Sequence, residues 1–270
     1  MPKEFGYAQE LWTISKLADH VRAHSEGAGH PRLKTVSPST VWTILNSQEL
    51  KPHRIRYYLE RRDPDFDTKM RSVLMVYKEV TLGLTGEKEG KTVTVSFDEK
   101  PGIQAISNTA PDLPPRPGNG CVGRDYEYKR LGTMSLLAGL DLVTGEVLGL
   151  VRDSHKSADF IEFLKAADQK YADAERIRLV LDNHSVHTSK ETRAYLATRP
   201  GRFEFVFTPK HGSWLNLVEG FFGKLARVCL KGIRVKSKDE LKERIERYLD
   251  EVNAMPVVYR WEYKMDEVVV

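Results

Sequence analysis

Apolar residues recur at two different periods along this chain, and the change of period divides it into two parts. Up to residue 83 they recur every three or four positions, which predicts helices over 11–24, from residue 38 onward, and over 66–82. Ser37 precedes the second of these helices as an N-cap, and Pro38 suits its first position. The first part of the chain is therefore expected to be helical.

The second part begins near Lys91 and carries strand patterns. Residues 92–97 alternate between polar and apolar side chains, which predicts a strand that ends at Asp98. A loop rich in Pro and Gly follows, and residues 134–153 predict a hairpin that turns at 143–145. The remaining pattern predicts a helix at 157–171, a strand at 177–182, a helix at 190–198, a strand at 203–207, and helices at 214–231 and 238–253. This order predicts an α/β fold with a mixed sheet and helices on its faces.

Two interruptions set the expected domain boundaries. Asp63-Pro64-Asp65 ends the first helical region, and the charged, Gly-containing stretch 84–91 precedes the first strand. We therefore expect a small all-α region at 1–62, a linker helix at 63–90 and an α/β domain at 91–270.

Composition excludes several classes of protein. The chain has 270 residues, 40% hydrophobic and 30% charged, which rules out collagen-like, low-complexity and wholly disordered proteins. The longest apolar run, Met134–Val143, is too short to span a bilayer. No secretory signal is visible at the N-terminus, so we expect a cytoplasmic protein without a membrane partner. The two cysteines, Cys121 and Cys229, form neither a CxxC pair nor a zinc-ligand pattern.

Positive charge is clustered, although the net charge of +4 is too small to decide on a nucleic-acid partner. Residues 51–62 contain five Lys or Arg against one acid, and residues 224–238 contain six and no acid. Either stretch could face phosphates, and a solvated surface explains each equally well.

The helix that begins at Pro38 resembles half of a helix-turn-helix unit. Its small hydroxyl residues can reach phosphates and base edges, and the following stretch 51–62 supplies cations. An ordinary helical hairpin remains an open alternative. The candidate DNA contacts of this region are Ser39, Thr40, Thr43, Arg54 and Arg56.

Three carboxylates are candidates for a metal site. Asp98 and Asp182 each follow a predicted strand, and ligands of open α/β sheets bind outside the carboxyl ends of strands. Glu219 lies within the apolar stretch 214–222, where a carboxylate is costly unless it is paired or metal-bound. An oxygen-only set suits Mg²⁺ or Mn²⁺ rather than zinc. The alternative is that the two Asp residues cap loops and that Glu219 pairs with a Lys.

Other polar residues flank these carboxylates. Glu99 should point away from Asp98 on an extended chain, and we expect it to support the site from behind. Asn183 and His184 either order the site or contact phosphate. Trp214 is expected in the core. The loop and helix around Glu219 add candidate DNA contacts at Lys210, His211, Lys224, Arg227 and Lys231, and for His211 a role in orienting water or capping the loop is equally open.

Three segments resemble the catalytic motifs of a known family. VSFDEKPGIQA (95–105), RLVLDNHSVH (178–187) and FTPKHGSWLNLVEGFFGKLAR (207–227) are similar to those of mariner-like bacterial insertion-sequence transposases. The similarity runs from about residue 40 to the end of the chain. The DDE domains of that family have a ribonuclease H-like fold, and the 36 residues between Asp182 and Glu219 are close to the family's usual spacing.

This resemblance implies a function. Asp98, Asp182 and Glu219 would be the DDE triad and hold two Mg²⁺ or Mn²⁺ ions, with Asp98 bridging the two. Such a site cuts DNA at the terminal inverted repeats of an insertion sequence and joins the freed 3′ end to target DNA, typically at TA. The implied partners are double-stranded DNA and a second copy of the chain, in the nucleoid of a bacterium.

One departure from the family pattern keeps two other functions open. Members usually carry another helix-turn-helix unit before the part that resembles residues 12–50, and we expect it to be missing here. The alternatives are a truncated DNA-binding remnant that represses transposition and a ribonuclease H-like nuclease without strand transfer.

Overall fold

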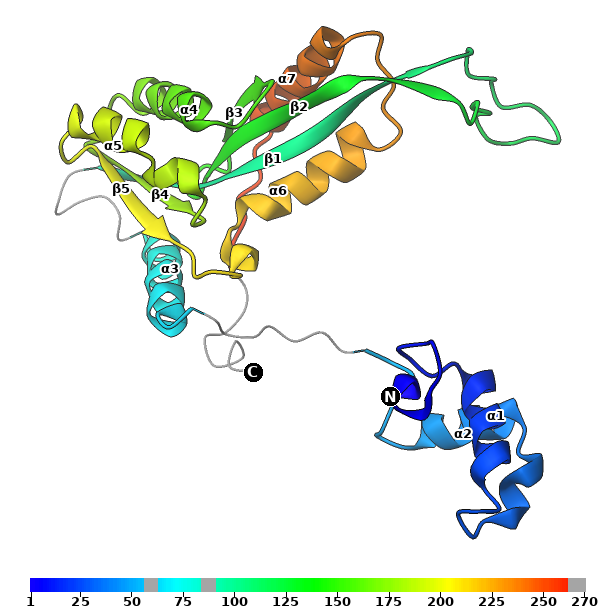
Figure 1. Ribbon diagram of the computed structural model, residues 1–270. Coiled ribbons are helices and arrows are strands. Elements are labelled where there is room, and N and C mark those ends of the chain that lie inside the picture. The colour runs from blue at the N-terminus through cyan, green and yellow to red at the C-terminus, as the bar shows by residue number, and fades with distance from the viewer. Residues whose placement is uncertain (56–62, 84–90, 262–270) are drawn as a thin grey trace. The chain divides into compact units, whose positions relative to one another are not determined.

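The structure is a computed structural model that describes residues 1–55, 63–83 and 91–261 (Figure 1). The chain forms two compact units, Met1–Glu60 and Arg61–Val270. The expected boundary stretch 84–90 lies outside the described residues. No helix in the described parts of the chain is long and apolar enough to cross a bilayer.

The first unit is a small helical cluster. It contains α1 (Ile14–His24) and α2 (Pro38–Ser47), with short 3-10 helices at Pro2–Phe5 and Pro31–Thr35. The Ser37 hydroxyl accepts a hydrogen bond from the Thr40 N–H at 3.1 Å, which confirms the predicted N-cap. The buried residues of its core are Ala18, Val36 and Val41.

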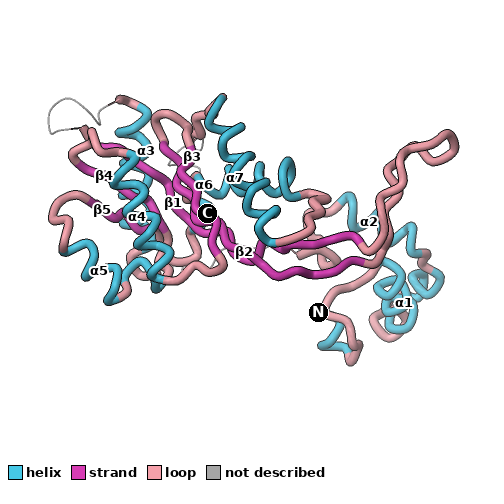
Figure 2. Tube along the Cα trace, turned by 90° about the horizontal axis from the view of Figure 1, so that it is seen from above, coloured by secondary structure: helices cyan, strands magenta, loops and turns pink. Residues whose placement is uncertain are grey.

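A five-stranded sheet forms the centre of the second unit (Figure 2). The strands lie in the order β3-β2-β1-β4-β5, and β1 pairs antiparallel with β2 and parallel with β4. This arrangement confirms the predicted mixed sheet. The bounds are β1 Thr92–Asn108, β2 Tyr128–Asp141, β3 Val147–Arg152, β4 Arg176–Leu181 and β5 Phe203–Phe207.

Helices cover both faces of the sheet (Figure 1). Alternate residues of β1 divide between the faces: Val95 and Phe97 pack against α4, whereas Ser96 faces α6. One face carries α4 (Ser157–Lys170) and α5 (Lys190–Ala197); the other carries α3 (Phe66–Thr81), α6 (Val218–Leu225) and α7 (Lys238–Ala254).

The prediction that the first strand ends at Asp98 was wrong. β1 continues to Asn108, because a shift of register between Lys100 and Ile103 accommodates Pro101 and Gly102 as a bulge and lets the pairing with β2 resume. Gly102 has φ 69°, which a glycine adopts without strain. Asp98 therefore lies in the middle of a continuous strand, and the far halves of β1 and β2 extend to the loop 109–127 (Figure 2).

The helix predicted at 214–231 is broken into three pieces. A 3-10 turn at Ser213–Leu215 precedes α6, and a π-helix at Ala226–Leu230 follows it. The helical pattern is interrupted at Asn216, and the side chain of this residue bonds to the backbone of β1. Trp214 was expected in the core but is 43% exposed, and its ring lies 5.7 Å from that of Trp261.

The helix expected as a linker contributes to the core of the second unit. Phe66, Met70, Val73 and Leu74 of α3 are buried. The Tyr77 hydroxyl donates to the Leu215 carbonyl at 2.6 Å, which ties α3 to the turn that leads into α6.

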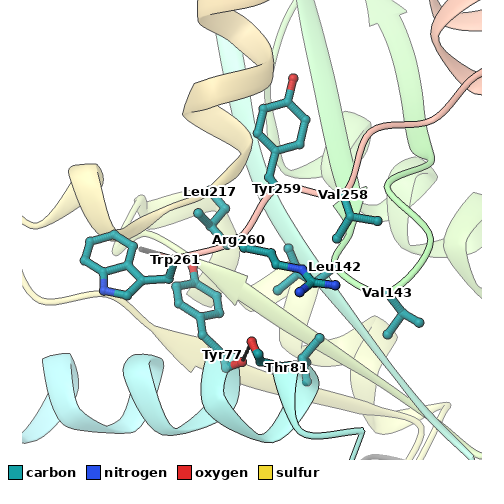
Figure 3. A pocket seen from close by; sticks show the side chains of 10 residues that line it. Tyr77, Thr81, Leu142, Val143, Leu217, Val258, Tyr259, Arg260 and Trp261 are labelled. Carbon is teal, nitrogen blue, oxygen red and sulfur yellow. Dashed lines mark hydrogen bonds between the residues drawn. The ribbon is translucent and has the colours of Figure 1, made fainter. Parts of the chain in front are cut away.

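The segment 256–261 packs on the face of the sheet that carries α3, α6 and α7, and it closes a small cavity there (Figure 3). The cavity has a volume of about 140 Å³, and Tyr77 and Leu217 lie in its wall with Tyr259 and Trp261. A Cβ at Gly220 would lie 3.2 Å from the Tyr259 ring. This close packing places the segment directly against the first turn of α6.

Gly145 provides a test of this packing. It has φ 77°, and a Cβ there would lie 2.5 Å from the Val257 backbone, whereas Gly201 has φ 73° and open space around it. Gly201→Ala should therefore cost only the strain of the left-handed backbone, about 1 kcal/mol. We expect Gly145→Ala to cost at least about 2 kcal/mol more, because the segment must shift. Thermal unfolding compares the two variants, and equal melting temperatures would show that the segment does not pack as described.

Candidate active site

The three candidate carboxylates come from three elements that meet at one edge of the sheet. Asp98 lies on β1 and Asp182 directly follows β4, and these two strands are parallel neighbours with Ser96 opposite Val180. Glu219 lies in the first turn of α6, which packs against β1. The parallel pairing thus places Asp98, within β1, beside the carboxyl end of β4 and Asp182, where ligands of α/β sheets bind.

A buried amide fixes α6 against β1. Asn216 is 1% exposed, and its Nδ2 donates to the Phe97 carbonyl at 2.7 Å and lies 3.4 Å from Asp98 Oδ2. Its Oδ1 accepts from the Ser96 hydroxyl, which in turn accepts from the Val218 N–H at 3.0 Å. These bonds join the strand that carries Asp98 to the helix that carries Glu219.

Asp98 is held in an environment that disfavours its charge. Burial and the charges of Glu99, Asp182 and Glu219 together raise its pKa to about 7, although the hydrogen bond from the Glu99 N–H opposes them. Neither Asp98 nor Glu219 pairs with a basic side chain among the residues that the structure describes. An acidic cluster in which two carboxylates lack a basic partner is a setting in which a bound cation is favourable.

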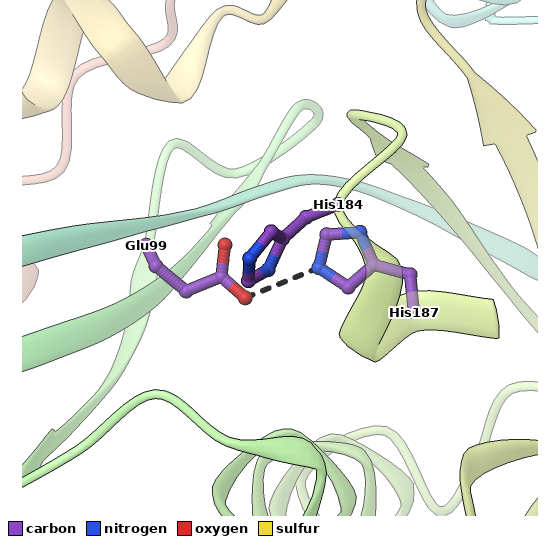
Figure 4. Close-up of side chains that lie close together, drawn as sticks. All are labelled: Glu99, His184 and His187. Atoms are coloured by element: carbon purple, nitrogen blue, oxygen red, sulfur yellow. Dashed lines mark hydrogen bonds and ion pairs between the residues drawn. The ribbon is translucent and has the colours of Figure 1, made fainter. Parts of the chain in front are cut away.

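Asp182 is oriented by a buried histidine, His187. The His187 side chain is fully buried, and its Nδ1 lies 3.3 Å from Asp182 Oδ1 and 3.1 Å from the Asp182 carbonyl. Its Nε2 lies 3.1 Å from Glu99 Oε1 (Figure 4). Burial disfavours the charged ring, but the bonds to Asp182 and Glu99 outweigh it and raise the His187 pKa to about 9. Both ring nitrogens then donate at neutral pH. The same contact lowers the Asp182 pKa against the opposing effect of burial.

Glu99 supports the site from the face opposite Asn216. Its carboxylate is 7% exposed and accepts from His187, whereas Asp98 contacts Asn216. The ligand oxygens of Asp98, Glu99 and Asp182 all lie within 4.8 Å of one another. This all-oxygen set fits a hard divalent cation such as Mg²⁺ or Mn²⁺.

A cleft of about 340 Å³ lies beside Asp182. Its wall includes Asn183 and His184 from the loop after β4, and Pro209, Lys210 and His211 from the turn after β5. Asn183 Nδ2 donates to the Thr208 carbonyl at 2.5 Å, so this residue joins the two segments. The structure therefore brings Lys210 and His211 next to the carboxylate site.

The remaining predicted DNA contacts are more dispersed. Lys224 is half-buried on α6, while Arg227 lies in the π-helix and Lys231 beyond it, so the expected stripe at α-helical spacing does not form as predicted. In the first unit Ser39, Thr40, Thr43 and Arg54 are exposed. The Ser39 and Thr40 hydroxyls both bond to Ser37, and that of Thr43 bonds to the Ser39 carbonyl. Arg56 lies outside the described residues.

Sequence reasoning missed two residues of the site. His187 follows Asp182 by five positions, and the His-x-x-His spacing of His184 and His187 was a visible signal. Asn216 gave no signal, because a single amide in an apolar stretch is not distinctive.

Comparison with known proteins is consistent with this site. The sequence profile of a family described as "DDE superfamily endonuclease" matches residues 93–242, more than half of the chain. A Shigella sonnei protein, "Insertion element IS630 uncharacterized 39 kDa protein", is 25% identical over 261 residues, which cover 94% of this chain and 68% of that protein.

Solved structures share the fold. The structure described as "Crystal structure of the Mos1 mariner paired end complex with Mn" superimposes with a TM-score of 0.56 at 17% identity over 94% of this chain and 70% of that chain. The corresponding Mos1 complex with Mg gives a TM-score of 0.53 at 14% identity, over 91% and 73% of the two chains. This similarity confirms the predicted ribonuclease H-like fold.

Proposed function

Because this chain belongs to the DDE endonuclease superfamily, we propose that it is an insertion-sequence transposase that cuts and rejoins DNA strands. Its similarity to an insertion-element protein and to structures of a mariner transposase with transposon ends supports this choice within the superfamily. The observation that carries the proposal is that the charges of Asp182, directly after β4, and of Glu219, on α6, both act on Asp98 of β1.

The triad carboxylates would hold Mg²⁺ or Mn²⁺, and we propose two ions. When bound, the ions activate the attacking oxygen and stabilise the leaving oxygen of an in-line displacement at phosphorus. His187 keeps Asp182 in a fixed orientation, and Asn216 keeps α6 and its Glu219 at a fixed position relative to Asp98. A water molecule as nucleophile gives cleavage, and a DNA 3′-hydroxyl gives strand transfer.

The remaining parts of the proposal concern DNA and partners. Residues 1–62 would bind the terminal inverted repeats, residues 91–270 would carry the chemistry, and α3 would join the two while it packs on the second. Two copies of the chain would pair two ends of the element in the cytoplasm of a bacterium. Contacts to phosphate are proposed for Ser39, Thr40, Thr43, Arg54, Arg56, Lys210, His211, Lys224, Arg227 and Lys231, with Asn183 and His184 beside the site.

A cleavage and strand-transfer assay tests the proposal. Purified protein is incubated with Mg²⁺ or Mn²⁺ and with duplex DNA that carries the terminal repeats from the sequence flanking the gene. We expect site-specific cuts that disappear in EDTA and in Asp182→Asn and Glu219→Gln, while DNA binding remains. Binding without cutting by the wild type would favour a repressor, and cutting without joining would favour a nuclease; either result would contradict the proposal.

A further inference from the structure

The turn at Pro209–Gly212 holds a histidine in a backbone conformation that glycine or asparagine adopts far more readily. The Gly212 N–H donates to the Pro209 carbonyl at 2.9 Å, which closes a four-residue turn. His211 occupies its third position with φ 63°, and it is the one non-glycine residue with positive φ in the described parts of the chain. A positive φ at this position is the signature of a type II turn, which selects for Gly or Asn.

The fold enforces this conformation from three sides. The buried carboxylate of Asp63 accepts from the Lys210 N–H at 3.0 Å and pairs with the Lys69 ammonium at 2.9 Å. The Thr208 N–H donates to the Leu181 carbonyl at 2.9 Å. A Cβ at Gly212 would lie 2.7 Å from the Pro209 ring, so the turn is closely packed. A strained residue inside a rigid turn indicates a role for its side chain.

The turn presents two basic side chains to the cleft beside Asp182. Lys210 and His211 are exposed, line the cleft, and have no ion-pair or hydrogen-bond partner for their side chains among the described residues. Two further polar atoms in the cleft wall are buried without partners: His184 Nδ1 and Thr208 Oγ1, the latter on a residue that is 1% exposed. Donors without acceptors, placed next to a carboxylate site, suit an anionic group that arrives together with the metal's substrate.

We propose that Lys210 and His211 form a binding site for a phosphate of the DNA backbone next to the phosphate that is cut. The inference rests on the proposed function. The cleft would bind a phosphate that neighbours the cut site, and the phosphate that reacts would lie at the metal-binding carboxylates. Because Asp63 anchors the turn and Asn183 joins it to the loop after β4, this contact would set the register of the strand relative to the metal-binding carboxylates.

Substitutions at residue 211 separate the side chain from the backbone. Asn and Gly both tolerate the left-handed conformation, so His211→Asn and His211→Gly remove the imidazole and keep the turn. We expect His211→Gly to melt about 2–4 °C above the wild type, because it relieves strain. Both variants should bind terminal-repeat DNA about tenfold to a hundredfold more weakly, as for the loss of a charge-assisted hydrogen bond. Arg176→Ala, at the opposite end of β4 from Asp182, is the matched control and should bind as the wild type does.

Methylphosphonate substitution identifies the ligand. A neutral methylphosphonate is placed at one phosphate at a time on either side of the cut site, and binding is measured by fluorescence anisotropy for the wild type and His211→Asn. With the methylphosphonate at the phosphate that His211 contacts, the wild type and His211→Asn should bind equally, because the neutral group already removes the contact from the wild type. If His211→Asn binds unmodified DNA as tightly as the wild type, or remains weaker at every substituted position, the inference is overturned. If the wild type neither binds nor cuts the DNA, the proposed function itself fails, and the inference fails with it.

Discussion

Asp98→Asn is expected to reduce metal-dependent DNA cleavage by at least about 10³-fold, because a neutral amide cannot replace the carboxylate that would hold the ions. Asn keeps the size of Asp and can accept the hydrogen bond from the Glu99 N–H, so the fold should be retained. Single-turnover cleavage rates in Mg²⁺ measure the effect.

The same substitution should stabilise the metal-free protein, and the sign of this effect depends on pH. The Asp98 pKa is raised from 3.8 to about 7 in the folded chain, so the ionised carboxylate disfavours the folded state. The penalty is absent below pH 4, grows as the pH rises toward 7 and is complete above it, at most about 4 kcal/mol. In EDTA, Asp98→Asn should therefore unfold at a higher temperature than the wild type at pH 8 and at the same temperature at pH 4.

Asp173→Asn is the matched control, because Asp173 is exposed and lies in the turn before β4, at the opposite edge of the sheet from Asp182. It should change neither cleavage nor stability. Wild-type cleavage by Asp98→Asn would remove this residue from the triad, and an equal loss of activity in Asp173→Asn would show that the assay does not report on the site.

The second large effect is expected at Asn216. Asn216→Ala leaves the Phe97 carbonyl and the Ser96 hydroxyl buried without their partner, which should destabilise the second unit by about 2–4 kcal/mol. Cleavage should fall at least about 100-fold, because α6 no longer holds Glu219 at a fixed position relative to Asp98. Urea unfolding and single-turnover rates measure the two effects.

A double-mutant cycle separates this network from ordinary packing. Ser96→Ala removes the hydroxyl that accepts from the Val218 N–H. The loss of stability in the double variant should therefore be smaller than the sum of the two single losses by about 1 kcal/mol or more. Additive losses of stability would mean that Ser96 and Asn216 do not act as one unit. Unchanged cleavage in Asn216→Ala would mean that the network does not position the triad.

Much of the fold follows from local pattern. The alternation in 92–97 and the apolar run in 177–181 predict two strands of a mixed sheet, and the sheet contains them as β1 and β4, which the structure shows to be parallel neighbours. The parallel pairing brings Asp98 and Asp182 together, although only Asp182 follows the end of its strand, because β1 continues past Asp98. The position of Glu219 within an apolar stretch suggested a buried carboxylate, but Glu219 is exposed, and its neighbours Val218, Phe221 and Phe222 are residues of α6 that pack inward.

The features that local pattern did not predict depend on tertiary contacts. Pro101 and Gly102 are typical of a loop, but pairing with β2 absorbs them as a bulge and the strand continues. Asp63 precedes a proline and was expected only to interrupt a helix; it binds the backbone of Lys210, 147 residues away in the sequence. His187 and Asn216 act through partners on other elements, and no periodicity reveals such pairs.

The central claim is that Asp98, Asp182 and Glu219 together bind the divalent cations that act on DNA. Anomalous diffraction from crystals of the protein soaked with Mn²⁺ tests it most directly. The account predicts two peaks about 3.5–4 Å apart, with Asp98 in contact with both and Asp182 and Glu219 each in contact with one. Manganese bound away from these three carboxylates, or a site that persists unchanged in Asp98→Asn, would contradict it.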